Sequence, residues 1–112
     1  MATEDRLSSS FAALADPTRR DILLRLRNGP LTVSELATYY AMSRPAVSQH
    51  LAVLEKAGLV ERNRRAQWNE CSLAQDSLNE IAAWIEQQRT AWNERFDRLE
   101  DYLAKEKPRD YN

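Results

Sequence analysis

The chain has 112 residues, 43% of them hydrophobic and 29% charged, with a formal net charge of −1. These values fit one globular domain over residues 1–112 and exclude a globally basic protein. The single cysteine, Cys71, excludes an intramolecular disulfide and fits a reducing cytosol. The N-terminus lacks the apolar core of a signal peptide, and no apolar run approaches the ~18 residues that a membrane-spanning helix needs. We therefore expect a cytoplasmic protein with no membrane contact.

Two helices are predicted in the first quarter of the chain. Three apolar residues at i, i+4 and i+7 predict the first helix, over about residues 4–15: Leu7, Phe11 and Leu14. Asp16 is a good N-cap and Pro17 suits the first helical position, so a second helix follows at once. This second helix is expected to end at about residue 28, before Gly29–Pro30.

Residues 32–57 are predicted to form a helix-turn-helix. Thr32 and Glu35 have the spacing of a capping box, which begins a third helix that runs to about Tyr40. After a tight turn, a fourth helix extends over residues 43–57. Two short helices joined by a tight turn, with the second polar on its outer side, are typical of this motif.

The helix over residues 43–57 has an apolar face and an unusual polar face. Its apolar residues recur at i, i+4 and i+7 and define the buried face: Val47, Leu51 and Leu54. The opposite face has short, polar side chains and no carboxylate. Such a face is expected of a helix in the major groove, where Ser and Gln can read base edges. An ordinary amphipathic helix is the alternative. The candidate DNA contacts here are Ser43, Arg44, Pro45, Ser48, Gln49 and His50. For His50, a packed side chain that locks the helix-turn-helix is an equally good interpretation.

A β-hairpin is predicted over residues 59–73, with its tip at residues 63–66. Alternation in the second half separates two faces: Trp68, Glu70 and Ser72 on one, Asn69, Cys71 and Leu73 on the other. We expect Cys71 to be buried and inert, with no basic residue beside it. A hairpin rich in arginine directly behind a helix-turn-helix is a wing, and its arginines can reach phosphates or the minor groove. A solvated turn is the alternative. The candidate contacts are Arg62, Arg64 and Arg65.

A long helix is predicted over about residues 76–105. Its apolar residues follow a 4-3-4-3 spacing that is interrupted only by Arg89, as in the seam of a coiled coil. At 1.5 Å per residue this helix is roughly 45 Å long, more than a domain of this size can cover. We therefore expect a second copy of the chain to cover the stripe, with the helix over residues 4–15 packing beside it. The predicted dimer contacts are Leu7, Phe11, Ile85, Trp92, Phe96, Leu99 and Leu103.

Four short segments together resemble one known family. They are Ala15–Leu23 (ADPTRRDIL), Ser34–Ala37 (SELA), Ala46–Leu51 (AVSQHL) and Ala57–Val60 (AGLV). The chain resembles the ArsR/SmtB family of bacterial winged-helix repressors from its first helix to about Leu103. The resemblance implies a homodimer that binds operator DNA, with the helix matching residues 43–57 in the major groove, and that releases DNA when an effector binds.

The chain departs from the metal-sensing members of that family. They carry cysteines at the positions that Thr32 and Ser34 occupy here, and one His and one Cys on different elements cannot form a Zn²⁺ site alone. We therefore expect no metal and no cofactor, and we find no catalytic constellation.

The predicted fold class is mainly α with a small β-hairpin, a winged helix-turn-helix with a long C-terminal dimerisation helix. The predicted function is a homodimeric, sequence-specific transcriptional regulator, most simply a repressor. Its partner would be double-stranded DNA with an inverted-repeat operator, and its effector is unknown. The alternative is a protein-interaction module that uses the long helix without specific DNA binding.

Overall fold

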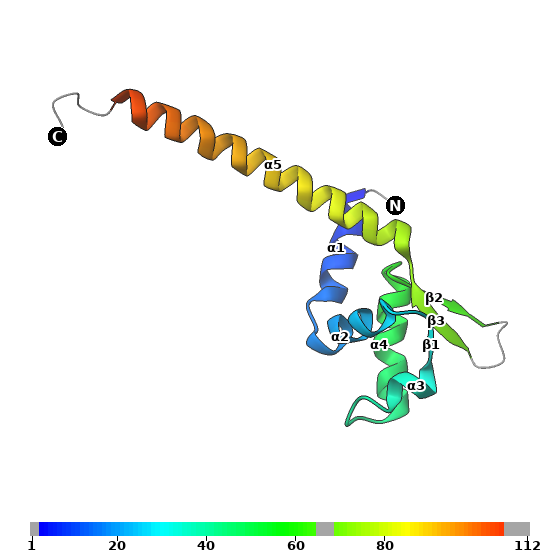
Figure 1. Ribbon diagram of the computed structural model, residues 1–112. Coiled ribbons are helices and arrows are strands. Elements are labelled where there is room, and N and C mark those ends of the chain that lie inside the picture. Colours follow the sequence, from blue (N-terminus) through cyan, green and yellow to red (C-terminus); the bar gives the residue numbers. More distant parts are fainter. Residues whose placement is uncertain (1–2, 65–68, 107–112) are drawn as a thin grey trace. The chain divides into compact units, whose positions relative to one another are not determined.

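The computed structural model describes residues 3–64 and 69–106, which form five helices and three strands (Figure 1). In chain order they are α1 (Thr3–Leu14), α2 (Pro17–Leu26), β1 (Leu31–Thr32), α3 (Val33–Ala37), α4 (Arg44–Lys56), β2 (Val60–Asn63), β3 (Glu70–Leu73) and α5 (Gln75–Glu106). The chain divides into two compact units, residues 1–81 and residues 82–112. The winged helix-turn-helix lies in the first unit, which confirms the predicted fold class.

Three helices begin at the caps that the sequence predicts. The Asp16 carboxylate accepts a hydrogen bond from the backbone N–H of Arg19 at 3.0 Å and starts α2. Thr32 and Glu35 form the reciprocal capping box at the start of α3, with both bonds at 3.0 Å. The Ser43 hydroxyl accepts from the backbone N–H of Ala46 at 3.2 Å and starts α4. Each cap satisfies an N–H group that a helix terminus would otherwise leave without a partner.

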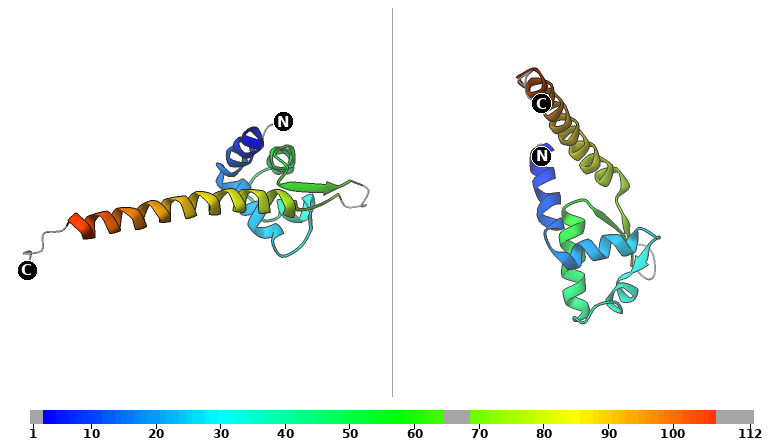
Figure 2. Two further views of the ribbon diagram at one scale, coloured as in Figure 1. Left: turned by 90° about the horizontal axis from the view of Figure 1, so that it is seen from above. Right: turned by 60° about the vertical axis from the view of Figure 1, so that its left-hand side comes forward.

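Helix α4 is the central element of the first unit and contacts α1, α2, α3 and β2 (Figures 1 and 2). Its predicted buried face is confirmed. The fully buried side chains of the core include three from α4 and four from other parts of the first unit: Val47, Leu51, Leu54, Ile22, Leu36, Leu59 and Cys71. Gly58 ends the helix with φ +81°, and the N–H groups of Gly58 and Leu59 donate to Glu55 and Leu54 carbonyls. This Schellman arrangement suits glycine and fixes the exit toward β2.

The sheet has three strands rather than the two of the predicted hairpin. Its order is β1-β3-β2, and both pairings are antiparallel. The added strand, β1, is only two residues long, with Leu31 opposite Cys71 and Thr32 opposite Glu70. It connects α2 to the start of α3, so the central strand β3 links the helix-turn-helix to the wing.

Two details of the first unit differ from the predictions. Helix α3 ends at Ala37, and the turn begins before Tyr40. The buried face of α1 consists of Leu7, Ser10 and Ala13, whereas the Phe11 side chain is 38% exposed. The i, i+4, i+7 pattern therefore located α1 correctly, but it assigned Phe11 to the buried face, which Ser10 and Ala13 form instead.

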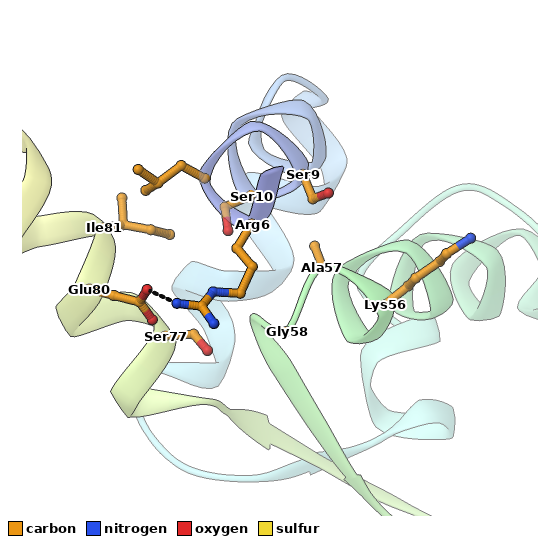
Figure 3. Close-up of a pocket in the computed structure, with 10 residues that line it drawn as sticks. Arg6, Ser9, Ser10, Lys56, Ala57, Gly58, Ser77, Glu80 and Ile81 are labelled. Carbon is orange, nitrogen blue, oxygen red and sulfur yellow. Dashed lines mark hydrogen bonds and ion pairs between the residues drawn. The ribbon is translucent and has the colours of Figure 1, made fainter. Parts of the chain in front are cut away.

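Helix α1 is also connected to the start of α5. Arg6 Nη2 donates to Glu80 Oε1 at 2.9 Å. This ion pair lies at a cleft of about 310 Å³ that α1, the end of α4 and the start of α5 line (Figure 3). Ser10, the only buried polar residue among those described, is on this cleft.

The described part of the second unit is the remainder of α5, residues 82–106. Helix α5 begins and ends within one residue of the predicted bounds. Every residue from 82 to 106 is exposed in the single chain. The exposed large apolar residues along it are Trp84, Ile85, Trp92, Phe96, Leu99, Tyr102 and Leu103. Within the described residues, no helix is both long enough and apolar enough to cross a membrane.

Candidate nucleic-acid interface

The outer side of α4 presents the polar residues that the sequence singles out. Ser43, Arg44, Pro45 and Gln49 are exposed, and Ser48 is half-buried. They occupy the N-terminal half of α4, while the fully buried residues on the opposite side hold the helix in the core. A helix fixed on one side, with small polar groups on the other, can lie against the base edges of a major groove.

His50 lies at the contact between α2 and α4. Its Nδ1 is 3.8 Å from Asp16 Oδ2 and 3.5 Å from Arg19 Nη1. The side chain is half-buried. The hydrogen bond from the Arg19 backbone lowers the pKa of Asp16, against the raising effect of burial, and the nearby charge of Arg19 lowers it further. This geometry favours the packed interpretation of His50, in which it connects the cap of α2 to α4.

Two arginines of α2 support the end of α1. Arg19 Nε donates to the Ala13 carbonyl at 2.6 Å, and Arg20 Nη1 donates to the Leu14 carbonyl at 2.8 Å. The last carbonyls of a helix have no partner within the helix, and a cation there also interacts favourably with the helix dipole. These guanidinium groups therefore stabilise the α1–α2 corner.

The two described wing arginines face α4. Arg64 donates two parallel hydrogen bonds to the Glu55 carboxylate, at 2.8 and 3.0 Å. Arg62 Nη2 donates to the Ser48 carbonyl at 3.3 Å, and Arg62 Nε lies 3.8 Å from Glu55 Oε1. The hydrogen bonds from Arg64 lower the pKa of Glu55 against the raising effect of burial. We call Glu55, Arg62 and Arg64 the Glu55 cluster. Arg65, the third predicted wing contact, lies outside the described residues.

Cys71 is buried, as predicted, but it does have a basic neighbour. Arg62 is its partner across the β2–β3 pair, and the Arg62 charge acts to lower the pKa of the thiol. Burial has the larger effect, and the pKa of Cys71 is raised. The prediction that no basic residue lies beside Cys71 was therefore wrong, although the thiol is still held in its neutral form. No group of three potential metal ligands occurs among the described residues.

The predicted dimer contacts fall into two groups. Leu7 is buried within the first unit, where it forms part of the core. Phe11 is partly exposed on α1, and five residues lie exposed along α5: Ile85, Trp92, Phe96, Leu99 and Leu103. The Trp92 and Phe96 rings stack on one another, with centroids 5.8 Å apart.

Comparison with known proteins places this arrangement in a family. The model of the bacterial regulatory protein, arsR family, matches residues 16–62. The transcriptional repressor SdpR of Bacillus subtilis is 34% identical over 79 residues, which cover 70% of this chain and 88% of SdpR. The chain belongs to the ArsR family. It is thus a transcriptional regulator with a winged helix-turn-helix DNA-binding domain, and its relatives are regulators rather than enzymes.

Solved structures of ArsR-family proteins agree with this assignment. An ArsR-like transcriptional regulator from Rhodococcus sp. RHA1 is 32% identical, with a TM-score of 0.78 over 91% of this chain and 96% of that one. A possible ArsR-family regulator from Mycobacterium bovis, Mb0332, is 28% identical, with a TM-score of 0.63 over 76% of this chain and 80% of that one. That protein's winged helix-turn-helix domain is described as homodimeric.

Sequence reasoning missed Glu55 as part of this surface. One signal could have revealed it: Val60 and Arg62 are two residues apart on one strand, so Arg62 shares the buried face with Val60. An arginine on a buried face needs a carboxylate or carbonyl partner. Glu55 is the acidic residue of α4, the helix against which that face packs.

Proposed function

We propose that the chain is a homodimeric, sequence-specific repressor that places α4 in the major groove of an inverted-repeat operator. The observation that carries this proposal is the outer side of α4. Ser48 and Gln49 lie there with Arg44 and Pro45, and residues 44–50 include no carboxylate. Gln pairs bidentately with adenine, while Ser accepts or donates to several bases. Arg44 is exposed at the start of the helix and supplies a cation for a phosphate contact in this proposal.

Dimerisation is supported by the apolar stripe of α5. Large apolar side chains recur along residues 85–103 and are about half exposed in the single chain. A contiguous exposed stripe of this kind usually marks an interface. A second copy of the chain suits it because the homodimeric Mb0332 domain shares the fold. Two-fold symmetry would place the two α4 helices one DNA turn apart, ~34–36 Å.

The direct test is binding of the purified protein to the DNA upstream of its own gene, measured by fluorescence anisotropy against random DNA of the same length. We expect the upstream DNA to bind at least ~10³-fold more tightly, the lower end of the range for specific DNA-binding proteins. A reporter gene behind the same DNA should be less active when the protein is present. Equal binding to both DNAs would instead favour the protein-interaction module.

A further inference from the structure

The Glu55 cluster places one carboxylate of α4 against the wing. The side chain of Glu55 is 27% exposed, that of Arg62 is 12% exposed and that of Arg64 is 63% exposed. Arg62 is thus largely enclosed against α4, while Arg64 is at the surface with two of its nitrogens on Glu55. Both described wing cations are therefore directed toward α4 in the free protein.

Glu55 and a DNA phosphate offer Arg64 the same kind of contact. Each is an anion with two oxygens that match the planar guanidinium fork in a bidentate pair. Arg64 Nη1 and Nη2 both donate to Glu55, so a phosphate can form the end-on bidentate pair with these two nitrogens only after the ion pair opens. Glu55 therefore competes directly with phosphate for this arginine.

We propose that Glu55 is a specificity-determining residue that lowers affinity for random DNA by holding Arg64. Random DNA is bound almost entirely through phosphate contacts, so withholding one cation reduces this binding most. Operator binding also includes base contacts from α4 and depends on the position of the wing, which the Glu55 cluster sets. Its affinity is therefore less sensitive to the release of one arginine. This inference rests on the proposed function, because it assumes that α4 and the wing contact DNA.

The first experiment compares Glu55→Gln with Glu61→Gln. Both changes remove one negative charge, but Glu61 is exposed on β2 and has no ion pair within the described residues. For random DNA, Glu55→Gln should steepen the slope of log K against log salt by about 0.9, the value for one added phosphate contact, which amounts to about eightfold tighter binding at ~0.1 M salt relative to ~1 M. Operator affinity should rise by a smaller factor, so the specificity ratio falls. Glu61→Gln should change the slope by much less.

A double-mutant cycle with Arg64→Gln tests whether the effect passes through Arg64. In the wild-type background, Arg64→Gln should hardly alter the slope for random DNA, because Arg64 is already held. In the Glu55→Gln background it should remove the added slope of about 0.9. Circular dichroism melting of each variant checks that the fold is intact. A merely structural role for Glu55 would change melting without this dependence on Arg64.

The outcomes separate this inference from the proposed function. If the wild-type protein shows no preference for its upstream DNA, the proposed function fails. If the preference is present but Glu55→Gln matches Glu61→Gln, or if Glu55→Gln and Arg64→Gln are additive, only the role of Glu55 is refuted. Equal gains for operator and random DNA would also refute it, because Glu55 would then set affinity without affecting specificity.

Discussion

Substitution of Phe96 by glutamate should break the proposed dimer. Phe96 lies on the α5 stripe, is 53% exposed in the single chain and stacks on Trp92. An aromatic side chain presents roughly 200 Å². Covering about half of that area on each of two protomers would remove about 200 Å² from water, which contributes about 5 kcal/mol at about 25 cal/mol per Å². Loss of this term should weaken dimerisation by roughly 10³- to 10⁴-fold. An unpaired carboxylate in the same place costs several kcal/mol more by desolvation.

Sedimentation equilibrium measures this loss directly. The wild-type chain should be dimeric at low micromolar concentration, and Phe96→Glu should be monomeric and bind operator DNA poorly. The matched control is Gln87→Glu, which adds the same charge nine residues earlier on the opposite side of α5. That variant should stay dimeric. A dimer that survives Phe96→Glu combined with Trp92→Glu would refute the arrangement.

Three further predictions concern the first unit. Gln49→Ala should weaken operator binding by about 1–3 kcal/mol and leave random DNA nearly unchanged, because a base contact is lost; equal losses on both DNAs in anisotropy would remove Gln49 from base reading. Leu51→Ala creates a cavity at a fully buried position of α4, so urea unfolding should show a loss of about 2–5 kcal/mol. Zn²⁺, Cd²⁺ and arsenite should leave operator binding unchanged, because Cys71 is the only thiol and is buried. A metal that binds stoichiometrically and weakens the DNA complex tenfold would contradict this expectation.

Much of the fold could be predicted because its signals are local. The caps at Asp16, Thr32 and Ser43 involve residues three apart, and each forms as expected. The bounds of α5 follow from a long periodic pattern. In contrast, β1 has only two residues, and two residues have no alternation to detect. It exists because β3 supplies partners for its backbone groups, and that pairing joins parts of the chain about forty residues apart.

The orientation of the candidate DNA-contacting side chains was less predictable, because the charge of a residue does not show which way its side chain points. The wing arginines were identified from composition and position, which give no information on whether a cation faces solvent or its own helix. Arg62 faces inward because the β2–β3 register pairs it with the buried Cys71. Once it is there, Glu55 becomes the nearest anion. Because Glu55 holds Arg64, neutralising Arg64 alone should hardly change the salt dependence of DNA binding.

The position of Cys71 allows its thiol to report local opening of the folded protein. The thiol is fully buried on β3, and burial raises its pKa, so an alkylating reagent cannot reach a thiolate in the closed sheet. Strand β3 pairs with β1 on one side and with β2 on the other. Labelling of Cys71 must therefore follow a fluctuation that opens the core around β3. The alkylation rate, compared with that of the unfolded chain, gives the population of that open state in the native protein. DNA that contacts both α4 and the wing would slow the alkylation of Cys71. The alkylation rate therefore reports DNA binding without an added label.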